Sequence, residues 1–438
     1  MKTIGIVGGG ITGLTCAYKL QNEFEVTLFE RDDNLGGQAQ TAEVNGITVE
    51  HAVSVVAELT YVEFFKIMKE IEFDEFKPYA LNGLHVHDRA KTAYYLDTNL
   101  RRLISLLPKY LKDKPLGIVD TLQLIPFFNR MYADYRKGDL DDVLVLDAYT
   151  KYPGYETLVT TVLTILSLIT SVQVKNTTIA HVLNFIFDFE NNKEYTNPLM
   201  QVIKLFNDVT VPDGGVGAYI DKLRGLTKAK FITNTEVINV RRNPDSTVTV
   251  CIADGGEVTF DTVIVAAQPF QVGSFLEYKN DEEQDGFSRL AELITHSMVT
   301  NHTDEGILPG VKSTDGFVDF RLDYHENASQ TTIAREGYFY TAQTLPESFK
   351  HNGRDGEIFS DTGVTPDNYS IDKEKILTQH FHAVQHMTPE TSVILNNIAE
   401  CSGEDNLHFA CAALSKYPTS QEGGVRSALS VVKKLQAV

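Results

Sequence analysis

The chain has 438 residues, and its 39 Lys and Arg against 59 Asp and Glu give a formal net charge of −20. This charge disfavours binding to nucleic-acid phosphates or anionic lipid, so no nucleic-acid partner is expected. The length predicts two or three domains, and 42% hydrophobic with 22% charged residues indicates a folded soluble protein. The four cysteines lie far apart in the sequence. This spacing disfavours a disulfide framework or a thiolate zinc site and favours a reducing, cytoplasmic location.

We expect no targeting or transmembrane segment. Residues 1–7 run directly into a glycine turn, which leaves no room for a signal peptide. The longest uncharged run, residues 157–174, reaches the lower length limit for a membrane-spanning helix. Eight of its eighteen residues are Thr, Ser or Gln, so we predict a buried helix of a soluble domain instead.

The strongest pattern lies at the start of the chain. Residues 4–7 form a short apolar run, followed by Gly8, Gly10 and Gly13 in the order GxGxxG and then by an apolar periodic stretch. The glycines permit a tight turn, close approach of backbone N–H groups to a pyrophosphate, and close packing of a helix. A second strand, residues 25–29, precedes Glu30, whose carboxylate can accept hydrogen bonds from ribose hydroxyls. The pattern predicts a dinucleotide-binding unit.

Residues 31–41 favour FAD over a nicotinamide cofactor. They contain Gly36 and Gly37, which would bring another loop against the diphosphate and ribityl chain, and a simple nicotinamide-binding unit does not need such a loop. With this segment the sequence resembles the flavin-containing amine oxidase superfamily, which includes phytoene desaturases and protoporphyrinogen oxidases. Residues 36–41, 44–49 and 59–65 are similar to the amine-oxidase-like flavoproteins associated with cyclopropane-fatty-acid synthases.

The resemblance implies an α/β fold in which a Rossmann-like FAD-binding domain, built from discontinuous segments, joins a mixed α+β substrate domain. Residues 1–60, 209–285 and 401–438 are expected to form the FAD-binding domain. Residues 61–208 and 286–400 are expected to form the substrate domain.

The middle of the chain is expected to return to the FAD-binding domain. Residues 211–223 match the superfamily's Gly-Gly turn before a helix. Residues 236–240, 247–251 and 257–260 alternate like the strands of a small antiparallel ribbon. Residues 261–269 are typical of a buried strand that ends at a proline turn.

The C-terminal segment is expected to complete the cofactor site. Residues 407–412 are strand-like, and residues 422–429 are similar to the family's helix start Glu-Asp-Gly-Val-Arg-Ser-Ala, with Gly423 in the second position. A helix N-terminus aimed at the flavin can stabilise negative charge on the reduced ring. The chain departs from the family at Cys411, where Gly is usual, and in residues 416–421, which lack the branch's aromatic and His pattern.

The motif and the resemblance together predict a set of residues that bind FAD non-covalently. The resemblance places backbone groups of Val237 against the adenine, and no motif around Cys401 or Cys411 indicates covalent attachment. The predicted cofactor-binding residues are Gly8, Gly10, Ile11, Thr12, Gly13, Glu30, Arg31, Gly36, Gly37, Gln38, Val237, Cys411, Gly424 and Val425.

Two insertions are expected to hold the substrate. The first is mostly amphipathic helix, with one face formed by Leu100, Leu103, Ile104, Leu107 and Leu111 and another by Val182, Leu183, Phe185, Ile186 and Phe189. The second has strand-like residues 316–322 and 337–340, and its residues 299–309 look like the branch's His-Thr-Asp segment followed by an apolar residue and Pro.

No motif assigns a catalytic residue. The candidates are His302, in the His-Thr-Asp segment, and Tyr338 and Tyr340, which would share one strand face and could line a pocket over the flavin. For His302 a structural role as a hydrogen-bonded side chain is favoured over a catalytic role. The same holds for Asp304. The amine-oxidase lysine that holds a water near the flavin has no recognisable counterpart.

No metal site is expected. His380, His382 and His386 lie close together, but no zincin pattern or acidic third ligand accompanies them.

These observations predict an FAD-dependent oxidoreductase of oxidase, dehydrogenase or desaturase type. It would remove hydride from a small lipophilic substrate, acyl or polyene, and pass the electrons to O₂ or another acceptor. The lipid assignment comes from the resemblance and the apolar helices. Two alternatives stay open: a redox-neutral, flavin-dependent double-bond isomerase of unsaturated fatty acids, and a non-catalytic flavin-binding partner protein.

Overall fold

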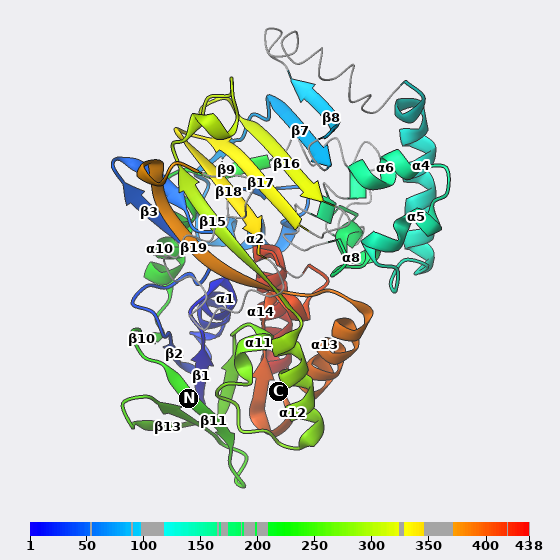
Figure 1. The fold of residues 1–438 in the computed structure, drawn as a ribbon. Coiled ribbons are helices and arrows are strands. Elements are labelled where there is room, and N and C mark those ends of the chain that lie inside the picture. Colours follow the sequence, from blue (N-terminus) through cyan, green and yellow to red (C-terminus); the bar gives the residue numbers. More distant parts are fainter. Residues whose placement is uncertain are drawn as a thin grey trace.

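The computed structural model describes residues 1–52, 55–88, 91–97, 118–163, 166–167, 174–184, 186–187, 198, 209–323, 328–345, 371–417 and 419–437. A parallel sheet lies at the end of the molecule that carries both termini, and a larger sheet lies at the other end, beside a group of helices (Figure 1). The helix face predicted within residues 100–111 lies outside the described residues, as do Phe185 and Phe189.

Five parallel strands form the sheet nearest the termini. Their order is β10 (Lys230–Ile232), β2 (Glu25–Phe29), β1 (Thr3–Val7), β14 (Thr262–Val265) and β20 (Leu407–Phe409). Alternate side chains enter cores on opposite faces, so that Ile264 packs on one face and Val263 and Val265 on the other. Strands from three distant parts of the chain therefore meet in one sheet, as expected for the discontinuous α/β fold.

Both faces of this sheet are covered. One carries α1 (Ile11–Leu20), α2 (Val62–Glu70), α10 (Val216–Leu226) and α14 (Gln421–Gln436). The other carries an antiparallel ribbon of β11 (Val237–Arg242), β12 (Val248–Ile252) and β13 (Glu257–Phe260), with α11 (Pro269–Val272), α12 (Asp281–Glu292) and α13 (Pro389–Cys401). The ribbon and the C-terminal helix lie where the sequence predicts them.

Two buried glutamates tie distant segments to helix N-termini. The Glu50 carboxylate accepts a hydrogen bond from the backbone N–H of Val216 (3.1 Å) at the start of α10. The Glu422 carboxylate accepts from the backbone N–H groups of Glu63 (3.1 Å) and Phe64 (2.8 Å) in the first turn of α2. Each negative charge satisfies orphan N–H groups at the positive end of a helix dipole, so it holds that helix against a remote segment.

A seven-stranded sheet forms the upper layer in Figure 1. Its order is β19 (Ile376–Gln385), β15 (Ile294–His302), β18 (Tyr338–Thr344), β17 (Ala328–Arg335), β16 (Phe317–Asp323), β7 (Gly83–Asp88) and β8 (Lys91–Asp97). Neighbours are antiparallel except for the parallel pair of β16 and β7. Smaller sheets pair β3 (Thr41–Val44) with β4 (Ile47–Glu50), and β9 (Val209–Pro212) with β5 (Val56–Ala57) and β6 (Phe76–Pro78). The strands predicted at 316–322 and 337–340 correspond to β16 and β18.

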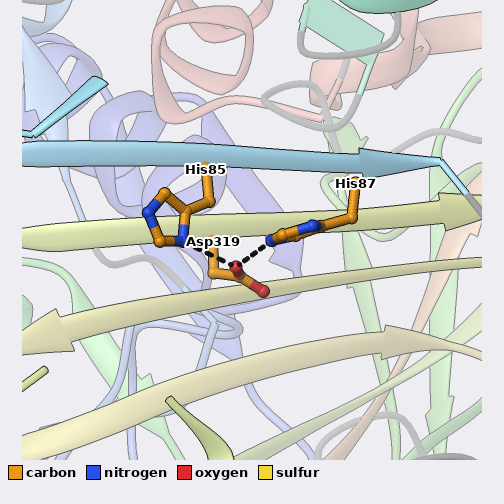
Figure 2. A group of neighbouring side chains, drawn as sticks. All are labelled: His85, His87 and Asp319. Carbon is orange, nitrogen blue, oxygen red and sulfur yellow. Dashed lines mark hydrogen bonds and ion pairs between the residues drawn. The ribbon is translucent and has the colours of Figure 1, made fainter. Parts of the chain in front are cut away.

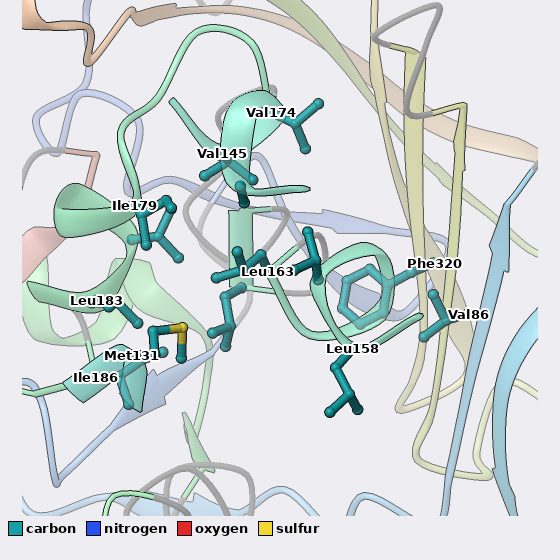
Figure 3. Close-up of a cluster of buried hydrophobic side chains, with 14 of the residues drawn as sticks. Val86, Met131, Val145, Leu158, Leu163, Val174, Ile179, Leu183, Ile186 and Phe320 are labelled. Carbon is teal, nitrogen blue, oxygen red and sulfur yellow. The ribbon is translucent and has the colours of Figure 1, made fainter. Parts of the chain in front are cut away.

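Helical segments pack beside this sheet. They are α4 (Ile118–Lys137), α5 (Ala148–Lys151), α6 (Glu156–Leu158), a π-helical turn (Val159–Leu163) and α8 (Ile179–Asn184). Short 3₁₀ turns span Val145–Asp147, Glu305–Ile307, Lys373–Lys375, Glu404–Asn406 and Ala412–Leu414. Buried side chains of the helical group form one cluster with Val86 and Phe320 of the sheet (Figure 3).

The described residues of the uncharged run 157–174 do not form one regular α-helix. Leu158, Val159 and Leu163 are fully buried, as predicted, yet α6 passes into the π-helical turn after three residues. The turn has the sequence VTTVL, and such β-branched residues lose side-chain freedom in an α-helix. Among the described residues, no helix is long and apolar enough to cross a membrane.

Candidate functional site

A groove of about 730 Å³ runs along the carboxyl ends of β1, β2 and β14, where open α/β sheets bind ligands. It begins at the glycine turn between β1 and α1. Gly8 has a φ of +109°, and a Cβ there would lie 2.7 Å from the Ala266 carbonyl oxygen. A Cβ on Gly13 would lie 2.0 Å from the Gly8 carbonyl oxygen. Only glycine fits either position, so the turn brings the N-terminus of α1 against the groove.

A second glycine loop closes on the first. Gly36 donates its backbone N–H to the Gly9 carbonyl oxygen (2.8 Å), and Gly37 has a φ of +60°. A Cβ on Gly37 would lie 3.2 Å from the Cα of Gly10. The two backbones thus form a cradle without side chains, and no side-chain bond caps the α1 N-terminus at Gly10. This cradle suits a diphosphate, whose oxygens accept from backbone N–H groups and are favoured by the helix dipole.

Glu30 lies at the end of β2 and organises the turn. Its Oε2 accepts from the Gly9 backbone N–H (2.6 Å), and its Oε1 accepts from the Asp32 backbone N–H (2.9 Å). Burial raises the pKa of this carboxyl, while the two backbone hydrogen bonds oppose that rise. Each oxygen has a further lone pair, so Glu30 can hold the turn and still accept hydrogen bonds from hydroxyl groups in the groove.

Most of the predicted cofactor residues line this groove. They are Gly8, Gly10, Ile11, Thr12, Glu30, Arg31, Gly36, Gly37, Gln38, Val237, Cys411 and Gly424. Gly13 and Val425 do not line it. Gly13 instead allows α1 to pack on the turn, and Val425 is fully buried in the core beneath α14.

The groove also meets the N-terminus of α14, where a Cβ on Gly424 would lie 2.7 Å from Thr12 Oγ1. Ser420 caps this helix by accepting from the Gly423 backbone N–H (3.0 Å), and Ser420, Gln421 and Gly424 line the groove. The N-terminus of this helix therefore opens onto the groove, and its role toward a flavin stays a prediction. Burial raises the pKa of the Cys411 thiol to about 12, so this groove residue stays protonated.

A second cavity, of about 280 Å³, adjoins the groove beside the N-terminus of α14. Its walls come mainly from the seven-stranded sheet, including Val299, Val318, Phe320 and Ile333. Among the described residues that line it, none is Asp, Glu, Lys or Arg. The residues that line both the cavity and the groove are Gln38, Gln268, His382, Thr419, Ser420 and Gln421. The cavity is therefore suited to an uncharged, largely apolar molecule that meets the cofactor at a polar junction.

The structure separates the two candidate tyrosines. Both pack on the cavity side of β18, as their spacing predicts, whereas Phe339 packs on the opposite face. Tyr340 lines the cavity, and its hydroxyl donates to the Ala52 carbonyl oxygen (2.7 Å). Tyr338 is fully buried and lines neither the cavity nor the groove. Tyr338 lies at the first position of β18, where it pairs with Arg335, so the structure gives no support to a pocket position for it.

His302 lies on the face of β15 that turns away from the cavity. Its Nε2 is 2.9 Å from the Thr341 hydroxyl, its Nδ1 accepts from the Asp304 backbone N–H (3.2 Å), and its ring stacks on Phe339. Burial lowers the pKa of His302 to about 4 and so keeps the ring neutral. These bonds favour the structural role over the catalytic one. Asp304 likewise ties the loop to Lys375 (3.1 Å).

The histidine group near 380 lies on or next to strand β19 rather than on a helix. His380 and His382 alternate with Phe381 along the strand, and His386 follows its end. His51, remote in sequence, joins them: its ring stacks on His380 at 3.5 Å, and its carbonyl oxygen lies 3.0 Å from His382 Nε2. The sequence pattern gave no reason to place His51 beside the groove or His382 at the junction. Gln268 could have been found, because it follows the end of buried strand β14.

Figure 2 shows another group that the sequence analysis missed, His85, His87 and Asp319. Asp319 Oδ1 lies 3.6 Å from His85 Nδ1 and 3.0 Å from His87 Nε2, distances that one metal ion could span. Asp319 Oδ2, however, accepts from Arg321 Nε (2.5 Å), so a cation already neutralises the carboxylate. Burial alone would raise the pKa of Asp319, but the histidine bonds and Arg321 hold it well below its usual range. We infer that this group is structural and holds strand β7 against strand β16.

Comparison with known proteins identifies the class of protein that this fold and groove define. Residues 11–279 match the family described as flavin containing amine oxidoreductase. This match covers more than half of the chain. The chain therefore belongs to this family of flavin-dependent oxidoreductases. No curated protein matches the sequence significantly.

Solved structures of this family share the fold over almost the whole chain. A double mutant of putrescine oxidase has a TM-score of 0.69 at 13% identity, covering 100% of this chain and 99% of that one. A CLA-producing fatty acid isomerase from P. acnes has a TM-score of 0.65 at 15% identity, covering 99% and 98%. Cyclohexylamine oxidase from Brevibacterium oxydans has a TM-score of 0.62 at 13% identity, covering 99% of each chain. At these identities the likeness concerns the fold.

Proposed function

We propose that this oxidoreductase binds FAD non-covalently and uses it to remove hydride from a neutral, lipophilic substrate of the acyl or polyene class, with O₂ or another acceptor taking the electrons. One observation carries the substrate class: the cavity beside the cofactor groove has no charged Asp, Glu, Lys or Arg among its described lining residues. When bound, the flavin would supply the two-electron chemistry, and the protein would supply orientation and exclusion of water. The domain boundaries given above belong to this proposal.

The lining of the groove offers suitable partners for the parts of FAD. The side-chain-free cradle at Gly10 and Gly37 suits the diphosphate, and Glu30 suits the adenosine ribose. Val237 also lines the groove, and the resemblance assigns it to the adenine. A non-covalent mode is supported by Cys411, the one cysteine among the described groove-lining residues, because its thiol is buried and protonated rather than a nucleophilic thiolate.

The cavity distinguishes lipids from amines on electrostatic grounds. An alkylammonium substrate would lose its hydration on entry, at a cost of several kcal/mol unless a carboxylate pairs with it. The described lining residues offer apolar side chains, such as Val299 and Phe320, together with uncharged amide and hydroxyl groups. A neutral acyl or polyene chain gains from the same surroundings, by roughly 25 cal/mol per Å² of apolar surface removed from water.

The test is anaerobic reduction of the FAD-loaded protein by neutral and charged probes. Methyl linoleate and phytoene represent the neutral lipids, and putrescine and dodecylamine represent the amines. We expect loss of the visible flavin absorbance with at least one neutral probe and none with putrescine. Reduction by the amines alone would overturn the substrate class. A protein that binds FAD but is reduced by no probe would favour the non-catalytic alternative.

Substitutions at Ala342, which lines the cavity, test where the substrate lies. Ala342→Phe would fill the cavity and is expected to raise KM for the neutral probe at least tenfold, about 1.4 kcal/mol of lost binding. Ala342→Ser keeps the cavity open and serves as the matched control. Both variants should keep the visible spectrum of bound FAD. Equal KM values for the two variants would place the substrate elsewhere.

The isomerase alternative is favoured by the same apolar cavity and by the fold shared with the fatty acid isomerase. An isomerase returns the hydride to another carbon, so it turns over without an acceptor. Multiple turnovers of linoleic acid under anaerobic conditions would support it, whereas one flavin reduction followed by a stall supports oxidation.

A further inference from the structure

The wall that the larger sheet gives to the cavity changes from polar to apolar along its strands. Strand register arranges the side chains of this sheet wall in three rows that run across the strands. All members of the rows line the cavity. The first row contains His382, Ser297, Thr344 and Ser329, the second Val299, Ala342, Thr331 and Phe320, and the third Tyr340, Ile333, Val318 and Leu84.

The first row brings together polar side chains from four strands. Ser297 lies opposite His382 on one side and Thr344 on the other. The Thr344 hydroxyl accepts a hydrogen bond from the backbone N–H of Ser329 (2.9 Å). His382 also lines the cofactor groove, whereas the three hydroxyl residues line the cavity without lining the groove. The polar row therefore begins at the junction and continues along the cavity.

Ser297 offers its hydroxyl group to a molecule in the cavity. Its side chain lies on the same face of β15 as that of Val299, and the residue is only half-buried. Among the described residues, none forms a hydrogen bond with Ser297 Oγ, and this oxygen is not one of the fully buried polar atoms. A hydroxyl group both donates and accepts, so Ser297 can bind the oxygen of an uncharged polar group.

The third row is apolar and buried. Ile333 lies opposite Tyr340 on one side and Val318 on the other, and all three belong to the large hydrophobic cluster. The Tyr340 hydroxyl is engaged, because it donates to the Ala52 carbonyl oxygen (2.7 Å). Thr344 and Tyr340 are four residues apart on β18, which separates the first row from the third by roughly 13 Å. An apolar chain that reaches the third row gains from the burial of its surface.

We propose that the substrate is an uncharged amphiphile, an acyl chain that carries a neutral ester or amide group at one end. This group lies at the first row, and the chain extends toward the third row. The inference rests on the proposed function and narrows its substrate class. A polyene hydrocarbon would cover the Ser297 hydroxyl without pairing it, and a free carboxylate would meet no Lys or Arg among the described lining residues. An ester or amide carbonyl oxygen accepts from Ser297 without bringing a charge into the cavity.

Equilibrium dialysis of the FAD-loaded protein with ¹⁴C-labelled probes tests this orientation without turnover. Methyl decanoate carries the ester, undecane lacks it, and decanoate carries the charge. Ser297→Ala should raise the Kd for methyl decanoate about three- to tenfold, the loss of one hydrogen bond, and leave the Kd for undecane within about twofold. Ser297→Thr keeps a hydroxyl group and should restore the binding of methyl decanoate. Decanoate should bind about tenfold more weakly than its methyl ester, or weaker still.

Thr331→Val is the matched control, because it removes a hydroxyl group from the second row of the same wall and keeps the branched shape. It should leave the Kd for methyl decanoate within about twofold of wild type. The visible flavin spectrum of each variant checks that FAD stays bound.

Three outcomes would overturn this inference alone, provided that a neutral probe still reduces the flavin. They are an unchanged Kd for methyl decanoate in Ser297→Ala, an equal rise in the Kd for undecane, and an equal rise in Thr331→Val. A wild type that binds putrescine but neither methyl decanoate nor undecane would overturn the proposed function and this inference together.

Discussion

Removal of the Glu30 carboxylate is the sharpest test of the cofactor groove. Glu30→Ala removes the acceptors of the Gly9 and Asp32 backbone N–H groups, which lie 2.6 and 2.9 Å from the carboxylate oxygens. It also removes the group proposed to bind the ribose. Hydrogen bonds to a charged group contribute about 1.5–3 kcal/mol each. Loss of one or two such bonds to the ribose, near 3 kcal/mol, corresponds to an increase of about 100-fold in the Kd for FAD.

The assay is titration of apoprotein with FAD, followed by quenching of FAD fluorescence. Glu30→Gln retains one carbonyl acceptor and should show an intermediate loss. Asp33→Ala is the matched control, because Asp33 is an exposed carboxylate that lines the same groove. Urea unfolding of each apoprotein separates a disordered turn from a lost ribose contact. A Kd for Glu30→Ala within about threefold of wild type would refute the ribose role.

Three further changes test the fold around the site. Gly13→Ala would place a Cβ 2.0 Å from a carbonyl oxygen of the glycine turn. We therefore expect weaker FAD binding and a free energy of unfolding in urea that is about 3 kcal/mol lower. The control is Gly225→Ala, in a helix with open space around it, which should be neutral or stabilising. Glu422→Gln leaves Arg426 without its ion pair and should lower the unfolding free energy by about 3 kcal/mol, which urea titration measures. The pKa of His302 in the folded protein, about 4, is below its ordinary 6.5, so the unfolded chain takes up the proton first as pH falls. The wild type should thus lose about 2 kcal/mol of stability through His302 between pH 7 and pH 5, and His302→Gln should abolish that part of the pH dependence.

Features that depend on local geometry were predictable from the sequence. Gly8 is required by the positive φ of the turn, and Gly13 by its contact with Gly8 in the same turn. The alternation of Val263, Ile264 and Val265 follows from the period of a strand. The start of α14 at Gln421 was likewise predictable, because its capping signals are adjacent in the chain.

Predictions of which side chains on a strand reach the cavity were less reliable. Tyr338 and Tyr340 share a face of β18, but only Tyr340 reaches the cavity, because Tyr338 lies at the first position of the strand, outside the part that lines the cavity. His302 belongs to a recognisable segment, yet the register of β15 turns it away from the cavity. A one-residue change of register reverses a side chain's face, and local sequence does not reveal that register.

The sequence alone determined the cofactor class and the α/β architecture, because a glycine turn, a carboxylate after the next strand and a buried apolar strand act over a few residues each. Only the tertiary structure decided which residues surround the junction between the groove and the cavity. His382 meets the carbonyl group of His51 across 331 residues of sequence, and the cavity walls come from strands paired across the larger sheet. Such contacts arise from the burial of whole sheet faces, so no short segment encodes them.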